Sequence, residues 1–238
     1  MTLHGKLIKA CGLALMLTMP AAAFATTISG SSTGSFSNVN CTDSCYTSSG
    51  NTVLDFGTVF FFFFPTDTST ITANALSFNA TTPATGVKLA ELTWDNQTTD
   101  NDNADHNPDV TAKWSFGVQF TSPSNVLDSG AYNLAIDQTE NPNVADTVTF
   151  SVANPLVISL PGITVSNLRF VLGSGSGSYS NNVWTDPENG TSHLYLEADF
   201  SNTTTQQQTS PVPEPGSMVL LGSGLVGLAT RIRRRFKR

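Results

Sequence analysis

The sequence predicts an all-β protein in which an antiparallel β-sandwich, jelly-roll-like, occupies the middle of the 238-residue chain. Three observations support this prediction. Apolar and polar residues alternate over residues 110–120, 148–152 and 194–200, which is the period of a half-buried strand. Clusters of Gly, Pro and Asn separate these runs, as turns do. No apolar pattern between residues 26 and 210 follows the 3.6-residue period of a helix.

Other strand candidates raise the number to about eight, which is typical of a sandwich. They are residues 53–64, 71–78, 87–94, 131–137 and 163–172. The consecutive phenylalanines Phe60–Phe64 cannot alternate between two faces, so we expect this strand to be covered on both sides or bulged. Packing explains them better than an aromatic platform for a sugar or partner. We therefore assign residues 51–200 to one β-sandwich domain.

The first 25 residues have the parts of a secretory signal peptide. Two lysines precede an apolar core over residues 10–19, and Ala23-Phe24-Ala25 fits the small-x-small cleavage pattern. We predict that signal peptidase cleaves between Ala25 and Thr26. An uncleaved membrane anchor is the competing interpretation, but the apolar core is shorter than the roughly 20 residues that a spanning helix needs.

The charge of the chain is unevenly distributed. Between residues 26 and 210 there are only three basic residues, Lys88, Lys113 and Arg169, against 17 acidic ones, so this part has a net charge of −14. Such a charge excludes nucleic acid and anionic membrane surfaces as partners, because both would repel it. It is compatible with bound cations.

Residues 26–50 are rich in Ser, Thr, Gly and Asn and predict a loose leader before the sandwich. This leader contains Cys41 and Cys45, the only cysteines after the signal peptide. In an exported protein, two cysteines this close favour a disulfide. A redox site more often has two residues between its cysteines, and a zinc site needs two further ligands that are not nearby.

The densest polar stretch is residues 95–109, between two predicted strands. Its aspartates offer the hard oxygen ligands that Ca²⁺ accepts, and the candidate ligands are Asp100, Asp102, Asp105 and Asp109. The stretch lacks the Gly and terminal Glu of an EF-hand. A solvated loop is the alternative interpretation, and Ca²⁺ is the one cofactor to which the sequence points.

The sequence contains no recognised catalytic motif. Glu197 and Asp199 lie on one face of a predicted strand, an arrangement compatible with the two carboxylates of a glycoside hydrolase, but this spacing is common on solvated faces. His106 and His193 lack the neighbours that metal or triad chemistry requires. We expect both to be ordinary surface residues.

The C-terminal part begins with a Thr- and Gln-rich flexible stalk, residues 201–210. Residues 211–238 follow and have three parts: the motif Val212-Pro213-Glu214-Pro215, an apolar run over residues 218–229, and an Arg-rich end. The prolines keep the motif extended and open to a protease. The apolar run predicts a transmembrane helix, and the basic end should stay on the cytoplasmic side.

This C-terminal part resembles a PEP-CTERM sorting signal, which exosortases of Gram-negative bacteria recognise. The resemblance implies cleavage near Pro213-Glu214-Pro215, a transient anchor in the inner membrane, and delivery to the cell surface or extracellular matrix, often alongside exopolysaccharide. Exosortase and signal peptidase would be the processing partners. The alternative is an ordinary single-span anchor, for which the apolar run is short.

Residues 76–200 are similar to the choice-of-anchor K domain, an exported bacterial domain found with differing sorting signals. The residues that carry this resemblance are Ala90–Thr99, Thr139–Val148 and Glu188–Phe200. That family has no established activity, so it implies no catalytic residues here.

The function that the sequence favours is that of a non-enzymatic, exported surface or matrix protein, sorted by an exosortase and associated with exopolysaccharide. A lectin-like carbohydrate-binding module is the alternative, with Trp94, Trp184 or Tyr195 as stacking platforms. A secreted glycoside hydrolase is the third hypothesis, and it needs two carboxyl groups about 5 to 10 Å apart in a cleft.

Overall fold

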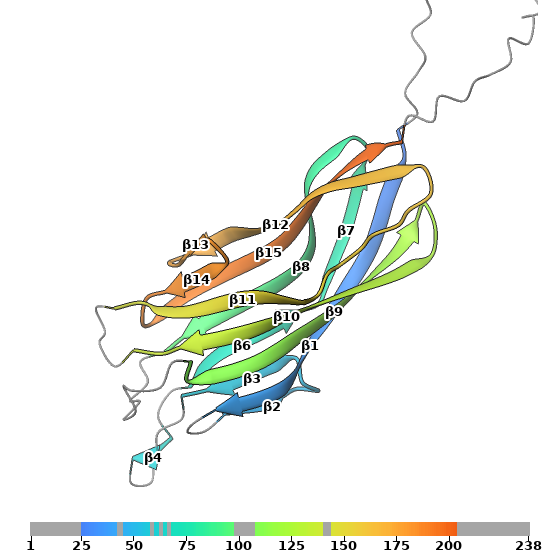
Figure 1. Ribbon diagram of the computed structural model, residues 1–238. Helices are drawn as coiled ribbons and strands as arrows, with labels where there is room; N and C mark the ends of the chain where they lie inside the picture. The colour runs from blue at the N-terminus through green and yellow to red at the C-terminus, as the bar shows by residue number, and fades with distance from the viewer. Residues whose placement is uncertain are drawn as a thin grey trace, which may run out of the picture. The chain divides into compact units, whose positions relative to one another are not determined.

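The computed structural model describes residues 25–41, 45–57, 60–61, 64–65, 68–97, 108–139 and 144–203. Within these ranges every helix or strand element is a β-strand, and all strand pairs are antiparallel (Figure 1). The predicted all-β, antiparallel class is therefore confirmed. The chain divides into two units, Met1–Thr203 and Thr204–Arg238. The predicted signal peptide up to residue 24, the stalk from residue 204 and the sorting helix lie outside the described residues.

Two large sheets make up the described domain. Sheet A contains, in spatial order, β13 (Ser178–Ser180), β14 (Val183–Asp186), β11 (Asp146–Asn154), β10 (Val126–Asp137), β9 (Val110–Ser122), β1 (Thr27–Cys41) and β7 (Leu76–Thr81). Sheet B contains β12 (Ile163–Gly175), β15 (Gly190–Asn202), β8 (Ala84–Asn96), β6 (Ser69–Asn74), β3 (Val53–Phe56) and β2 (Cys45–Ser48). A separate pair is formed by β4 (Phe60–Phe61) and β5 (Phe64–Pro65).

The two sheets pack around one hydrophobic core, as a sandwich requires. Alternate residues of β9 point into this core, which confirms the period of two read from the sequence. Aromatic pairs join the sheets along its length: Trp94 with Trp184 (ring centroids 5.3 Å apart), Phe120 with Phe200 (6.3 Å) and Trp114 with Phe170 (6.3 Å). The finer, jelly-roll-like description stays a prediction.

The expectation of a loose leader before the sandwich is wrong for residues 27–41, which form β1 between β9 and β7 inside sheet A. The small residues that suggested disorder are needed for close packing. A Cβ on Gly30 would collide with the Gln119 carbonyl, and one on Gly34 would lie 2.6 Å from Trp114 Nε1. Low hydrophobicity in this strand therefore reflects crowding between neighbours, not an absence of structure.

Two predicted strand runs are divided in the structure. The run over residues 53–64 ends as β3 at Phe56, and the phenylalanine segment supplies the separate β4–β5 pair. The run over residues 71–78 breaks at residue 75, so that β6 belongs to sheet B and β7 to sheet A. The alternation of buried and exposed residues continues on both sides of the break. The pattern therefore does not indicate where the chain passes from one sheet to the other.

The sandwich has two ends that differ in chemistry. β15 has 13 residues, so at roughly 3.3 Å per residue it runs about 40 Å from one end to the other. We name one end the termini pole, where Thr26, Thr82 and Asn202 meet. We name the other end the acidic pole, where Asp146, Asp186 and Glu188 lie near the start of β15.

Candidate functional site

The predicted signal-peptide cleavage site lies at the termini pole. Ala25 and Thr26 are the first described residues, and Thr26 is already fixed in the fold. Its backbone N–H donates to Thr82 Oγ1 (2.9 Å), and its carbonyl accepts from the Thr82 N–H (2.9 Å). Thr26, on the C-terminal side of the predicted cleavage site, is thus already part of the domain, while cleavage itself stays a prediction.

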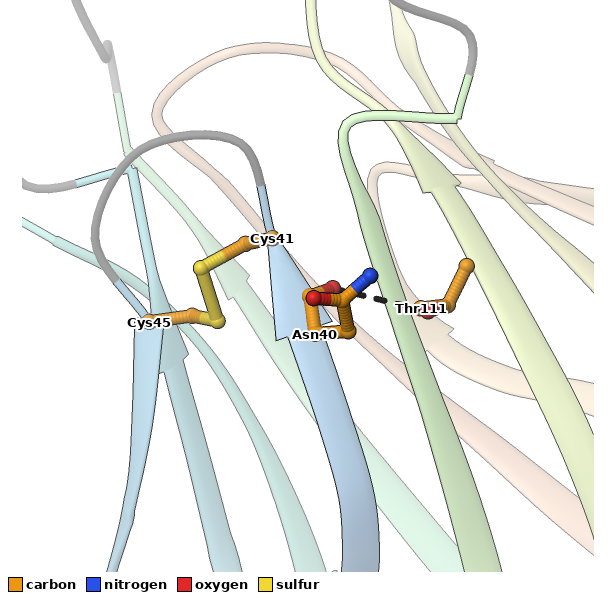
Figure 2. The surroundings of a disulfide bond; sticks show 4 residues. All are labelled: Asn40, Cys41, Cys45 and Thr111. Carbon is orange, nitrogen blue, oxygen red and sulfur yellow. Dashed lines mark hydrogen bonds between the residues drawn. A yellow bond between two sulfur atoms is a disulfide. The ribbon is translucent and has the colours of Figure 1, made fainter.

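Cys41 and Cys45 are joined in the structure by a disulfide, with their Cα atoms 6.1 Å apart (Figure 2). Cys41 ends β1, and Cys45 begins β2, so the bond links sheet A to sheet B. Cys41 is also in register with Val110 at the start of β9. The disulfide therefore ties the two sheets together at the acidic pole.

The predicted calcium ligands are not brought together by the described structure. Asp100, Asp102 and Asp105 lie outside the described residues. Asp109 is buried just before β9, where its Oδ2 accepts a hydrogen bond from the Gln138 N–H (2.7 Å). Within the described ranges there is no group of three or more His, Cys, Asp or Glu side chains arranged to hold a metal ion.

The sequence reading missed a buried polar layer at the acidic pole. Asp146 and Asp186 face inward from sheet A, where β11 and β14 place them opposite each other. Asn96 and Ser192 face inward from sheet B. All four side chains are fully buried. Ser192 bonds to Trp184 of the tryptophan pair described above, so the buried interior here contains charged and polar groups beside the apolar core.

Asp186 is fully satisfied by hydrogen bonds. Ser176 Oγ donates to its Oδ1 (2.8 Å), and Ser192 Oγ donates to its Oδ2 (2.8 Å). Trp184 Nε1 in turn donates to Ser192 Oγ (3.0 Å), and Asn96 Nδ2 donates to the Asp186 carbonyl (2.9 Å). Burial raises the pKa of Asp186, and the two serine bonds oppose that rise. This network ties the two sheets together.

Asp146 and Glu188 are satisfied much less well. Asp146 Oδ1 accepts from the Thr139 N–H (2.8 Å) and Oγ1 (3.0 Å), whereas its Oδ2 is buried and accepts no hydrogen bond. Both carboxylate oxygens of Glu188 are shielded from solvent and also lack a donor. Burial raises the pKa of Asp146 to about 6, the Thr139 hydrogen bonds and the Asn96 amide oppose that rise, and the Glu188 charge raises the pKa further. The two carboxylates therefore repel each other.

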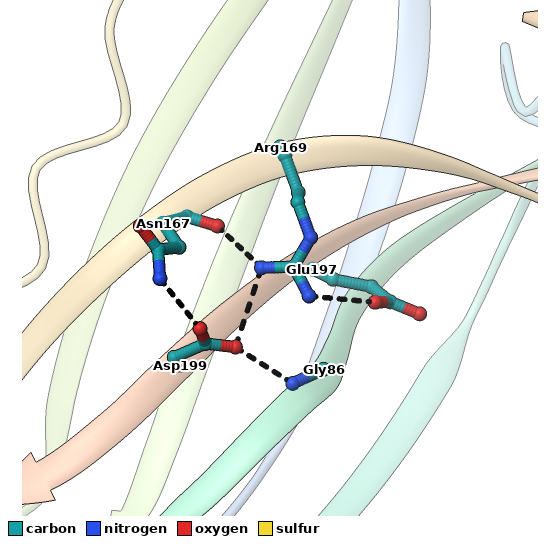
Figure 3. A network of polar contacts seen from close by, with 5 residues as sticks. All are labelled: Gly86, Asn167, Arg169, Glu197 and Asp199. Atoms are coloured by element: carbon teal, nitrogen blue, oxygen red, sulfur yellow. Dashed lines mark hydrogen bonds and ion pairs between the residues drawn. The ribbon is translucent and has the colours of Figure 1, made fainter.

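The outer face of sheet B carries Glu197 and Asp199, the carboxylate pair that raised the glycoside hydrolase hypothesis. Arg169 lies 3.5 Å from Glu197 and 3.2 Å from Asp199 (Figure 3). Hydrogen bonds from Asn167 (2.7 Å) and the Gly86 N–H (2.8 Å) lower the pKa of Asp199, and Arg169 adds to this effect. The acid of a glycosidase needs a raised pKa, so the lowered pKa of Asp199 does not fit that role.

The proposed stacking platforms are wrong for the two tryptophans. Trp94 and Trp184 are 0% exposed, so neither can receive a sugar ring. The ring of Tyr195 is covered by Lys88, whose Nζ lies 3.5 Å from the ring centroid. His193, expected to be an ordinary surface residue, is part-buried, and its Nδ1 lies 2.9 Å from Glu91 Oε1. His106 lies outside the described residues.

A signal for the acidic pole is present in the sequence. Asp146 continues the inward phase of Val148 and Phe150, and Asp186 continues that of Trp184. A carboxylate in phase with buried apolar residues at the end of a strand marks an inward-facing charge. Glu188 carries no such pattern, because it lies in the turn between β14 and β15.

Comparison with known proteins identifies the C-terminal part of the chain. Residues 211–235 match the PEP-CTERM protein-sorting motif, which confirms that predicted resemblance and includes Val212, Pro213, Glu214 and Pro215. The motif implies an exported protein that an exosortase sorts to the cell surface. No curated protein and no solved structure matches the chain. The similarity of residues 76–200 to the choice-of-anchor K domain finds no support in these comparisons.

The sorting residues and the apolar run after them lie outside the described residues. Among the residues that the structure does describe, none forms a helix that is long and apolar enough to cross a membrane.

Proposed function

We propose that this chain is a non-enzymatic surface or extracellular-matrix protein of a Gram-negative bacterium, associated with exopolysaccharide. Signal peptidase would release Thr26 as the new N-terminus. The apolar run after residue 217 would then hold the protein in the inner membrane until an exosortase cleaves near Pro213-Glu214-Pro215. The observation that carries this proposal is the PEP-CTERM match over residues 211–235, downstream of an N-terminal secretory signal.

The arrangement of the domain supports this route. Thr82 Oγ1 accepts from the Thr26 N–H (2.9 Å) and donates to Asn202 Oδ1 (2.5 Å). The first residue after the signal peptide and the last strand before the stalk therefore meet at the termini pole (Figure 1). This leaves the acidic pole at the opposite end of a domain about 40 Å long, where it is free to contact matrix components.

A lectin-like module would have to bind its ligand away from the tryptophans. The outer face of sheet A has a shallow depression of about 410 Å³, lined by small and polar residues that include Ser35, Lys113, Ser129 and Asn154. These groups can hydrogen-bond a polar ligand. The depression has no exposed aromatic ring among its lining residues, so it lacks the stacking surface on which the lectin hypothesis was based.

The sorting step is tested by the substitution Glu214→Ala in the tagged full-length protein. Insertion depends on apolar length and basic charge, so it should be unchanged, whereas motif recognition should fail. We expect most of the variant to stay in the membrane fraction with its Arg-rich end attached. Wild type should lose that end only in a host that has its exosortase. Immunoblots from hosts with and without the exosortase measure whether the Arg-rich end is retained, and Ser217→Ala is the matched control.

Wild type that keeps its C-terminal end in the presence of the exosortase would show that the segment is a simple anchor. Terminal peptides and intact mass of the processed protein check the other end. The N-terminal peptide should begin at Thr26, and retention of Met1 on exported protein would contradict the signal-peptide assignment.

A further inference from the structure

We propose that Asp146 and Glu188 bind a divalent cation, Ca²⁺, at the acidic pole. This site differs from the calcium loop predicted from the sequence, whose four aspartates it does not use. It also goes beyond the proposed sorting function, because it concerns the exported domain and not the C-terminal part.

The first argument is a contrast between two buried aspartates. Asp146 and Asp186 are in register on neighbouring strands, and both are 0% exposed. Both oxygens of Asp186 accept hydrogen bonds from serine hydroxyls. Asp146 Oδ2 accepts none, although buried polar atoms in folded proteins almost always have a partner. The fold therefore satisfies one carboxylate completely and leaves one oxygen of the other without a protein donor.

The second argument is Glu188, which lies in the turn before β15. Its two carboxylate oxygens each expose less than 1 Å² and accept no hydrogen bond. Its charge acts on Asp146. Three carboxylate oxygens that are shielded from solvent and lack a protein donor thus belong to two carboxylates whose charges act on each other. Two uncompensated negative charges out of water are strongly unfavourable, so a positive partner is required.

The basic residues between positions 26 and 210 do not supply this positive partner in the described structure. Only Lys88, Lys113 and Arg169 are basic between residues 26 and 210. Arg169 pairs with Glu197 and Asp199 on the outer face of sheet B, and Lys88 lies over the Tyr195 ring. Lys113 alternates along β9 with the buried Ala112 and Trp114, so it points away from the core.

The available ligands select the kind of cation. Carboxylate oxygens without His or Cys favour a hard ion over zinc or copper. Ca²⁺ accepts six to eight oxygens in flexible geometry, and extracellular sites bind it with a Kd of about 10⁻⁴–10⁻³ M. Since no third acidic, His or Cys side chain joins a metal-binding group in the described part of the chain, carbonyl oxygens and water would complete the shell.

The test uses the exported protein purified from its host, with melting temperature and isothermal titration as readouts. Replacing chelator by 5 mM CaCl₂ should raise the Tm of wild type by about 3–8 °C. Glu188→Gln should abolish this rise and weaken Ca²⁺ binding at least about tenfold. Its Tm in chelator should equal or exceed that of wild type, because the repulsion with Asp146 is gone.

The matched control is Glu197→Gln, which removes the same charge on the outer face of sheet B and should keep the full Ca²⁺ response. The proposal is wrong if wild type shows no Ca²⁺ response, or if Glu188→Gln retains it. It is also wrong if NaCl at equal ionic strength gives the same rise, since that indicates general screening of the −14 charge. Loss of the response in an Asp100→Asn, Asp102→Asn, Asp105→Asn variant, with Glu188→Gln unaffected, would place the ion in the predicted loop instead.

One further outcome separates a cation from a proton. The Tm could be the same in Ca²⁺ and in chelator but rise as the pH is lowered from 8 to 5. In that case a proton shared by Asp146 and Glu188 balances their negative charge. That result would overturn the proposal.

Discussion

The two poles of the sandwich join the same two sheets by different chemistry. At the termini pole, neutral hydroxyl, amide and backbone groups of Thr26, Thr82 and Asn202 form a short hydrogen-bonded chain. At the acidic pole, the sheets are joined by the Cys41–Cys45 disulfide and by a buried network around Asp186. The first pole contains no charged side chain in this chain of contacts, whereas the second contains carboxylates whose oxygens lack donors.

This difference shows what each pole can do. Neutral groups that satisfy one another hold a chain end at little electrostatic cost and need no ligand. Buried carboxylates are costly, and proteins keep them where a network, a metal ion or a function compensates. The termini pole is thus suited to attachment, and the acidic pole is where we propose that a cation binds.

The largest effect should come from removing the apolar base of the acidic pole. Trp184 is fully buried, packs edge-on against Trp94 and donates to Ser192. We expect Trp184→Ala to lower the free energy of unfolding by about 3–5 kcal/mol, because it leaves a large cavity. Urea denaturation measures this. Trp184→Phe should lower the free energy of unfolding by less. Equal decreases for Trp184→Ala and Trp184→Phe would show that the hydrogen bond to Ser192 matters more than side-chain volume.

An intermediate effect should come from the covalent link at the acidic pole. The disulfide closes a loop with a sequence separation of 4 residues. The entropy of so short a loop corresponds to about 2 kcal/mol of stability in the chain-entropy model. Cys41→Ser with Cys45→Ser should therefore lower the free energy of unfolding by about that amount. Reduced wild type is the matched control, and rapid alkylation of both thiols in unreduced folded protein would contradict the bond.

The smallest effect should come from the neutral contacts of the termini pole. Thr82→Val keeps the shape of the side chain but removes the hydroxyl that contacts Thr26 and Asn202. We expect a loss of about 1 kcal/mol in the free energy of unfolding, the usual value for such hydrogen bonds. Thr82→Ser retains the hydroxyl and should lose less. A larger loss for Thr82→Val than for the cysteine double variant would reverse the ranking of the two poles.

Much of the fold could be predicted from local patterns. The alternation in β9 and β15 arises because each strand places successive side chains on opposite faces, so burial is visible in the sequence itself. The same rule failed for β1, where glycines face the rings and backbone of neighbouring strands. Crowding from distant residues removes the large apolar side chains on which pattern recognition depends.

The candidate site divides in the same way. The sorting motif could be recognised because it is contiguous: its prolines, apolar run and basic end work as one linear segment. The phase of Asp146 and Asp186 marks each as inward-facing, but the acidic pole as a whole could not be recognised. Its groups come from β8, β11, β14, β15 and the turn before β15. Their proximity depends on strand register and sheet packing, which no local pattern encodes.

The sequence by itself therefore determined the all-β class, the sorting motif and the strongly negative charge of the exported part. Alternation, motif order and charge are properties of the chain that folding does not change. Only the tertiary structure decided that Trp94 and Trp184 are core residues and that Glu197 and Asp199 share Arg169. It also decided which carboxylates are buried without donors, because burial and hydrogen bonding depend on which segments the two sheets bring together.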